Sequence, residues 1–507
     1  MKQTNKMRKA AYWAAHKPLW DAKQKPEPIV TDAAPQSDQC PLARKCGGCQ
    51  MQNLPYDRQL QWKQATEIRL LGRFGRGAPI IGMENPRHYR NKAQAAFGTT
   101  RNGKIVSGVY QSGTHRIVMV DRCMIQDERA DRIIVTIRGL LRDFKIAPYD
   151  EDAHTGLLRH VLVRTAHATD QILVVLVTSK SMFPSRNHFV AALRAAHPEI
   201  TTIVQNINDQ PTSMVLGTRE IVLYGPGKIE DILCGCRFSL SPRSFYQINP
   251  VQTEVLYGKA IEFAGLTGTE TVIDAYCGIG TIGLVAAPHA QSVIGVELND
   301  DAVRDAAANA RRNGITNATF IRGDAGEFMQ DMARRGKSAD VLLMDPPRAG
   351  SDRRFLASAV TLAPERIVYV SCAPDTLARD LTFLVQHGYR VRRIQPVDMF
   401  PFTHHIETVC LLSKLNTKQH IEVDIHMDEL DLTDAEKKAT YGEIKDYVLE
   451  HTGLKVSSLY IAQVKQKCGI IERENYNKPK SEDARQPQCP PDKEKAIKEA
   501  LKHFGMI

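Results

Sequence analysis

Apolar and polar positions alternate in two different ways along the chain, and the pattern changes near residue 270. From Thr271 to about Leu415, apolar runs of strand length are separated by segments of helix length. The runs are TVIDAYCGIG, SVIGVEL, ATFIRGD, DVLLMDPP, RIVYVSC, YRVRRIQPVDMF and IETVCLLSKL. Continuous apolar strands joined by helices are typical of a parallel sheet covered on both faces. The pattern therefore predicts an α/β domain, which we place at residues 241–416.

The preceding region has short runs that are rich in β-branched residues. Between Gln94 and Leu240 they are IVMV, HVLVRT, QILVVLVT and REIVLYG. Such runs predict a mostly antiparallel sheet with helical insertions. Pro250 directly follows Asn249, and this pair, ahead of spaced apolar residues, predicts a helix that begins at Pro250.

Residues 1–39 carry scattered prolines and lysines without sustained periodicity, which predicts a mobile basic arm. We divide the rest of the chain into a β-rich region at 40–240, the α/β domain at 241–416 and a tail at 421–507.

The tail has the pattern of two helices. Thr433 and Glu436 form a capping box before a helix that Gly453 can end, and a second helix fits Ser458 to Lys467. Two helices joined by a short turn resemble a helix-turn-helix, a form that binds nucleic acid in some proteins and only packs two helices in others. The role of this small helical extension stays open.

Length and composition narrow the class of protein. The chain has 507 residues, of which 43% are hydrophobic and 24% charged, as in a globular protein with several domains. Its longest aliphatic run, Ile172 to Val177, is too short to cross a bilayer, and the first residues do not resemble a secretory signal. We therefore expect a cytoplasmic protein without a membrane partner.

Charge is distributed unevenly. The net charge of the whole chain is +10, whereas residues 1–130 hold 22 basic and 10 acidic residues and so carry +12. A local positive field of this size favours a polyanionic partner, most simply nucleic acid, although basic arms are often only solvated.

A glycine loop follows the first strand of the α/β domain. Gly278, Gly280 and Gly283 form G-x-G-x-x-G, and Glu297 ends the next strand, where a carboxylate can bind ribose hydroxyls. A nicotinamide dehydrogenase would share this pattern, and an ordinary glycine turn would too. Asp274 before the glycines and the D-P-P that begins at Asp345 favour an S-adenosylmethionine-dependent methyltransferase.

A thiol and a carboxylate are expected at the same sheet edge. Cys372 follows the strand RIVYVS, and Glu407 lies 35 residues further on. A thiolate that adds to carbon 6 of uracil makes carbon 5 an enolate, which can then accept a methyl group. A base must next remove the proton from carbon 5. We assign Cys372 as the nucleophile and Glu407 as the base; a lone cysteine in this position would usually be structural.

The chain from Cys40 to about Leu415 resembles the RNA uracil-5-methyltransferase family, in its iron–sulfur 23S ribosomal RNA branch. The similar motifs, in order, are SPRSFYQINP, DAYCGIGTIGL, GVELND, DPPRAG, YVSCAP and THHIETV. The resemblance implies a Rossmann-like methyltransferase domain beside a β-rich iron–sulfur and RNA-binding domain. It implies these S-adenosylmethionine-binding residues: Gln247, Tyr276, Thr281, Glu297, Asp324 and Asp345.

Four cysteines in the first quarter suggest a metal site. Cys40, Cys46 and Cys49 have the spacing C-x5-C-x2-C, and Cys123 is a distant fourth thiol. Spacing alone leaves zinc, an iron–sulfur cluster and unbound thiols open. The resemblance points to a [4Fe-4S] cluster held by all four thiols. Such a cluster has no open iron, so we expect a structural role.

One departure from the family concerns RNA binding. Many relatives begin with a small β-barrel RNA-binding domain, which the 39 residues before Cys40 cannot hold. We expect the basic arm, the helical tail or both to replace it. The predicted function is 5-methyluridine formation in 23S ribosomal RNA by a monomer. Transfer RNA methylation and a non-catalytic RNA-binding iron–sulfur protein are the alternatives.

Overall fold

The computed structural model describes residues 40–111, 114–212, 214–415, 441–468, 489–504 and 506. The chain forms two compact units, Met1–Asn416 and Thr417–Ile507. The predicted arm at 1–39 and the capping box of Thr433 and Glu436 lie outside the described residues.

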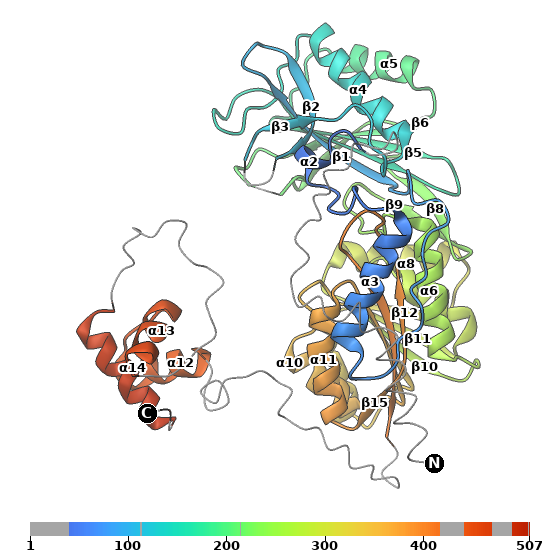
Figure 1. Ribbon diagram of the computed structural model, residues 1–507. Coiled ribbons are helices and arrows are strands. Elements are labelled where there is room, and N and C mark those ends of the chain that lie inside the picture. The colour runs from blue at the N-terminus through green and yellow to red at the C-terminus, as the bar shows by residue number, and fades with distance from the viewer. Residues whose placement is uncertain are drawn as a thin grey trace. The chain divides into compact units, whose positions relative to one another are not determined.

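The first sheet of the larger unit has seven strands in the order β3-β2-β1-β4-β5-β6-β7. All neighbouring pairs are antiparallel except β5 and β6, which run parallel. Helices α4 (Glu128–Asp143) and α5 (Arg186–Ala196) cover one face (Figure 1). The strands are β1 (Lys92–Thr99), β2 (Ile105–Tyr110), β3 (Ile117–Met119), β4 (Leu158–Thr165), β5 (Ile172–Thr178), β6 (Ile200–Ile207) and β7 (Arg219–Tyr224).

The second sheet also has seven strands, in the order β12-β11-β10-β13-β14-β16-β15. Every strand runs parallel to the others except β16, which is antiparallel to β14 and to β15. The predicted α/β domain is thus confirmed, with one reversed strand. The strands are β10 (Thr271–Ala275), β11 (Ser292–Glu297), β12 (Ala318–Arg322), β13 (Val341–Met344), β14 (Arg366–Ser371), β15 (Tyr389–Val397) and β16 (Glu407–Lys414).

Helices cover both faces of the second sheet, and each face has its own apolar core. One core joins the sheet to α6 (Pro250–Ala264), α7 (Thr281–Ala286) and α8 (Asp300–Arg312). The other joins it to α9 (Ala325–Arg334), α10 (Arg353–Leu362) and α11 (Pro374–Gln386). As predicted, α6 begins at Pro250, because the Asn249 side chain accepts a hydrogen bond from the Gln252 N–H.

Two elements join the sheets into one unit. Helix α3 (Tyr56–Leu71) belongs by sequence to the cysteine-rich region, yet its buried Leu71 lies in the core beside α11. The hairpin of β8 (Ile229–Leu233) and β9 (Cys236–Leu240) contributes to a core that contains residues of both large sheets. The β-rich region and the α/β domain therefore share their hydrophobic interior.

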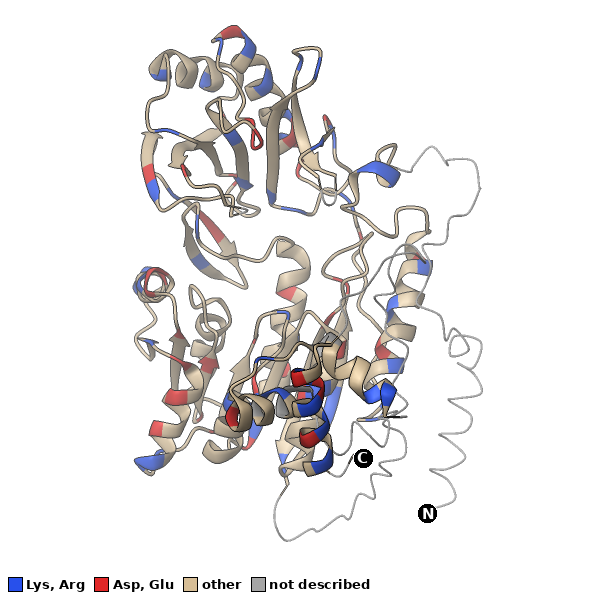
Figure 2. Ribbon diagram, turned by 90° about the vertical axis from the view of Figure 1, so that its left-hand side faces the viewer, with Lys and Arg blue, Asp and Glu red and all other residues tan. Residues whose placement is uncertain are grey.

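Basic residues remain numerous in the described part of the first quarter. Residues 40–130 contain 15 basic and 6 acidic residues. Across the larger unit, Figure 2 shows basic and acidic residues interspersed along the helices and loops. Among the described residues, no helix combines the length and apolar character that a membrane span requires.

The smaller unit contains three described helices, α12 (Tyr441–Thr452), α13 (Ser458–Lys467) and α14 (Pro491–His503). Gly453 follows α12 in the left-handed conformation, so this predicted end is confirmed. The sequence analysis did not predict α14, whose Ile497 and Leu501 are fully buried against Ile444 and Val464. Within the unit, α12 and α13 thus share a core with α14.

Candidate active site

The glycine loop after β10 is held by two carboxylates. Asp274 accepts a hydrogen bond from the Gly283 N–H at 2.9 Å, and Glu297 accepts one from the Gly278 N–H at 3.2 Å. Tyr276 has a positive φ of 62°, an uncommon conformation for a large side chain. The surrounding hydrogen bonds therefore fix a strained loop at the carboxyl end of β10.

A cavity of about 580 Å³ opens beside this loop. It lies where the strand order changes direction, since β11 pairs with one side of β10 and β13 with the other. Ligands of open α/β sheets bind at such a point. The cavity brings together seven residues to which the sequence analysis gave a role in catalysis or cofactor binding: Gln247, Tyr276, Thr281, Glu297, Asp345, Cys372 and Glu407.

Asp324 does not line this cavity. Its carboxylate caps α9 by accepting a hydrogen bond from the Glu327 N–H at 2.9 Å. Asp324 is nevertheless near the cavity residue Tyr276. Burial raises the pKa of Tyr276 to about 12, and the charge of Asp324 adds to that rise. Its role in cofactor binding stays a prediction.

The reversed direction of β16 brings Glu407 beside Cys372. In the antiparallel pair of β14 and β16, Ser371 lies opposite Thr408. Glu407, the first residue of β16, therefore lies at the edge where β14 ends and Cys372 follows. A parallel strand would have placed its first residue at the opposite edge of the sheet.

Burial and neighbouring acids raise the pKa values of the catalytic candidates. Burial, together with the charge of Asp345, raises the pKa of Glu407 well above its usual range. Burial also raises the pKa of Asp345, to about 7. The pKa of the Cys372 thiol rises to about 11 because of burial and the charges of Glu407 and Asp345, while Arg348 opposes the rise.

Two features can favour a thiolate at Cys372. Arg348, directly after the D-P-P motif, lines the same cavity and lowers the pKa of the thiol. Helix α11 begins at Pro374, two residues beyond Cys372, so its positive end is close to the sulfur. Both features come from the fold, because the sequence alone does not show which groups lie near the thiol.

The cavity also contains residues that the sequence analysis did not select. The Tyr257 hydroxyl lies 3.2 Å from the Thr281 Oγ1. Phe245, inside the SPRSFYQINP motif, lines the cavity with 72% of its surface exposed. Membership of the motifs could have suggested Phe245 and His405, whereas Tyr257 lies inside helix α6 and carried no such signal.

The cysteine-rich region forms one wall of the cavity. Gly48, between Cys46 and Cys49, lines it, as do Tyr89 and Arg90. The Met51 N–H donates a hydrogen bond to the Phe402 carbonyl at 3.0 Å, next to the cavity residue Thr403. The segment that precedes Glu407 is therefore attached to the chain that follows the cysteines.

Cys49 is near enough to the other three predicted metal ligands for their charges to affect its thiol. Burial raises the pKa of Cys49 to about 11, and the charges of Cys123, Cys46 and Cys40 add to the rise. Cys49 and Cys123 both contact a small apolar cluster that contains Tyr89 and Phe402. Within the described part of the chain, no group of three or more His, Cys, Asp or Glu side chains is arranged to hold a metal ion.

Fold and cavity together define an S-adenosylmethionine-dependent methyltransferase of the α/β type. A solved structure with a similar fold is the Pyrococcus abyssi tRNA (uracil-54, C5)-methyltransferase in complex with S-adenosyl-L-homocysteine. Its TM-score is 0.61 and its sequence identity 26%, over 75% of this chain and 87% of that one. The chain belongs to the tRNA (Uracil-5-)-methyltransferase family, whose sequence model matches residues 55–415.

Curated relatives agree with this assignment. An uncharacterized RNA methyltransferase of Halalkalibacterium halodurans is 46% identical over 382 residues, which cover 74% of this chain and 83% of the relative. One from Listeria innocua is 46% identical over 378 residues, with the same coverage of both chains. The protein is thus an S-adenosylmethionine-dependent RNA uracil-5-methyltransferase, as the sequence analysis predicted at this level.

Proposed function

We propose that this protein methylates carbon 5 of a uridine in 23S ribosomal RNA through a covalent adduct with Cys372. One observation carries the proposal: a single cavity contains Cys372, Glu407 and the glycine loop expected to bind the methyl donor. Reaching carbon 5 in folded RNA requires the target base to leave its stack and enter this cavity. The residues proposed to bind S-adenosylmethionine are Gln247, Tyr276, Thr281, Glu297 and Asp345, which line the cavity, and Asp324, which does not.

In the proposed reaction, the Cys372 thiolate forms a bond to carbon 6 of uracil, and the electron pair moves to the carbon 5 enolate. Carbon 5 then takes the methyl group from the sulfonium, and S-adenosylhomocysteine leaves. The Glu407 carboxylate removes the proton from carbon 5, the bond between sulfur and carbon 6 breaks, and the thiolate is restored. Arg348 favours the thiolate form.

Glu407 suits the role of base because it is only 4% exposed and its pKa is raised by burial. A carboxylate with a raised pKa is a stronger base than one in water. Its proton must leave before it can act, so methyl transfer should accelerate as the pH rises through the raised pKa of Glu407.

Two variants test the covalent step. Glu407→Gln should form the adduct without resolving it, and a denaturing gel should show protein that migrates with RNA. Cys372→Ala should give neither adduct nor methylated RNA while RNA binding remains. Cys277→Ala provides the matched control, since this second thiol also lines the cavity. Full methyl transfer by Cys372→Ala would refute the covalent mechanism.

The choice of ribosomal RNA rests on sequence features. The cysteine set and the THHIE sequence at 403–407 favour the ribosomal branch, whereas the relative of known structure is named for transfer RNA. Mass spectrometric mapping of 5-methyluridine in both RNAs, from cells with and without the protein, separates the two. Loss of the modification from transfer RNA alone would overturn the ribosomal assignment.

We further propose that Cys40, Cys46, Cys49 and Cys123 hold a [4Fe-4S] cluster with a structural role. The mutual influence of their charges supports a shared site. The resemblance of the chain to the iron–sulfur branch of the family favours a cluster over a single zinc ion. When bound, the cluster would fix the cavity wall that includes Gly48. Anaerobic purification followed by iron and sulfide analysis tests this, and stoichiometric zinc would refute it.

A further inference from the structure

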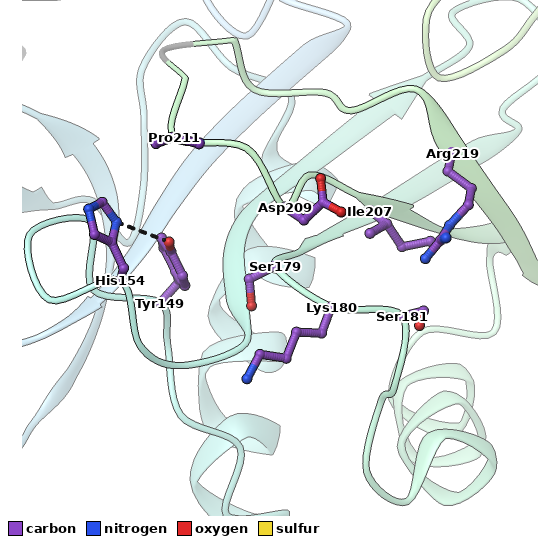
Figure 3. A pocket seen from close by; sticks show the side chains of 9 residues that line it. All are labelled: Tyr149, His154, Ser179, Lys180, Ser181, Ile207, Asp209, Pro211 and Arg219. Atoms are coloured by element: carbon purple, nitrogen blue, oxygen red, sulfur yellow. Dashed lines mark hydrogen bonds between the residues drawn. The ribbon is translucent and has the colours of Figure 1, made fainter.

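A second cavity, of about 550 Å³, lies in the first sheet. It lies at the carboxyl ends of β5 and β6, which are the parallel pair of that sheet. This is the edge at which open sheets with parallel strands bind ligands. Figure 3 shows the side chains around the hollow, with Tyr149 and His154 at one end and Arg219 at the other. The lining also includes Ser179, Lys180, Ser181, Ile207, Asp209 and Pro211.

A buried arginine fixes two walls of this cavity. Arg159 is only 2% exposed and donates hydrogen bonds to the carbonyls of Asn208 and Gln210 at 2.9 and 2.8 Å. The same guanidinium pairs with Glu151 at 2.7 Å and lies 4.8 Å from the centroid of the Tyr149 ring. Because one rigid group holds both loops, the walls are formed before any ligand arrives.

The base of the cavity is fixed in a similar way. The fully buried Gln205 donates from its Nε2 to the carbonyls of Lys180 and Ser181 at 3.1 and 3.2 Å. The Ser179 hydroxyl donates to the Gly156 carbonyl at 2.8 Å. The backbone at these positions is thus anchored, while the long side chain of Lys180 extends along the hollow (Figure 3).

The chemistry of the lining fits a nucleotide. Lys180 and Arg219 are cations that attract a phosphate, and Tyr149 offers an aromatic surface for a base. Asp209 would repel a bare phosphate, yet its carboxylate can accept a hydrogen bond from a base N–H or a ribose hydroxyl. The volume lies within the range of about 300–1,000 Å³ that is usual for ligand pockets. Cations and a carboxylate together favour a nucleotide over an inorganic anion.

We propose that this second cavity binds one unpaired nucleotide of the RNA substrate, outside the nucleotide that is methylated. The proposal rests on the proposed function, because it assumes that RNA is the substrate. The phosphate contacts Lys180 and Arg219, and the sugar or base donates to Asp209. The cavity thereby helps to position the RNA substrate for methyl transfer in the active cavity.

A charge-matched pair of double variants tests the site. Lys180→Ala/Arg219→Ala removes two cations from the cavity. Arg334→Ala/Lys337→Ala removes two exposed cations, one at the last residue of α9 and one just after that helix. Both precede β13 and so lie at the sheet edge opposite the active cavity. Fluorescence anisotropy with a labelled oligouridylate measures affinity against salt concentration, and calorimetry checks that S-adenosylmethionine still binds.

We expect the cavity variant to bind the oligouridylate more weakly, on the order of tenfold, and the control variant to bind like the natural protein. The slope of log affinity against log salt should fall by about 0.7, because the contact with one phosphate of a single strand is lost. In methylation assays, KM for RNA should rise while kcat is unchanged. Equal losses in both double variants, or no loss in the cavity variant, would overturn the proposal.

Asp209→Asn separates a nucleotide from a bare anion. If the carboxylate accepts a hydrogen bond from the nucleotide, this variant binds the oligouridylate less tightly. Tighter binding, with inorganic phosphate competing as well as uridine monophosphate, would refute the proposed nucleotide. Binding is measured without methyl transfer. If the natural protein binds RNA but never methylates it, the proposed function is refuted while the proposed nucleotide site is not.

Discussion

Lys63 and Asp398 form an ion pair that is fully buried between helix α3 and the segment that precedes Glu407. The Lys63 Nζ lies 2.6 Å from an Asp398 carboxylate oxygen, and both side chains are 0% exposed. The same ammonium donates to the Phe400 carbonyl at 3.1 Å, and the Tyr56 hydroxyl donates to the second Asp398 oxygen at 2.8 Å. Burial lowers the pKa of Lys63, and the charge of Asp398 opposes this effect.

Lys63→Met keeps the length of the side chain but leaves the Asp398 carboxylate buried with one hydrogen-bond donor, Tyr56. Removing one partner of a buried pair costs about 3–5 kcal/mol, and the remaining hydroxyl favours the lower end of that range. We therefore expect a loss of about 3 kcal/mol in the free energy of unfolding, measured by urea titration with circular dichroism. A fall in kcat should accompany it, because this segment carries Thr403 and His405 into the active cavity.

The double variant Lys63→Met/Asp398→Asn removes both charges and should recover most of the lost stability. With Asp398→Asn as the second single variant, the resulting cycle should give a coupling free energy of at least about 2 kcal/mol. Lys259→Met is the control, because its pair with Glu262 is exposed and should contribute less than about 1 kcal/mol. The reasoning is refuted if Lys63→Met is as stable as the control, or if the double variant is no more stable than Lys63→Met.

Two further predictions concern the catalytic thiol and the glycine loop. Arg348→Ala removes the cation that lowers the pKa of Cys372, so this pKa should rise further. The increase of kcat/KM with pH should therefore move to higher pH. An unchanged pH profile would contradict this prediction. Gly283→Ala places a Cβ 2.7 Å from an Asp274 oxygen and should cost about 1–3 kcal/mol in thermal or urea unfolding, with weaker cofactor binding in calorimetry. The control Gly258→Ala, in the exposed middle of α6 with open space around the new Cβ, should instead stabilise the protein by about 1 kcal/mol.

Much of the α/β domain could be predicted because its signals are local. Apolar runs such as VLLM and RIVYVS form strands that are almost entirely buried, and a run of this kind indicates a strand wherever it lies in the chain. The start of α6 at Asn249 and Pro250 could be predicted in the same way, because the cap is formed by neighbouring residues. Helix α14 was missed, although Ala496, Ile497, Ala500 and Leu501 repeat with helical spacing.

The prediction that Cys372 and Glu407 lie at the same sheet edge was correct, but the reasoning behind it was incomplete. The sequence analysis assumed a parallel sheet, in which a residue that begins a strand lies at the edge opposite to one that follows a strand. Only the reversed β16 places Glu407 beside Cys372. Strand direction depends on which neighbours a strand pairs with, and the hydrophobic pattern of IETVCLLSKL does not contain that information.

By itself, the sequence determined the two sheets, the glycine loop and the chemical groups available for catalysis, because periodicity and short motifs depend on neighbouring residues. The tertiary structure decided which distant groups meet. It placed Gly48 and Tyr89 in the wall of the active cavity, and it paired Lys63 with Asp398, 335 residues further along the chain. It also raised the pKa of Glu407, since burial beside Asp345 is a property of the folded interior. Contacts across hundreds of residues arise only when the chain folds, and the reactivity of this site depends on them.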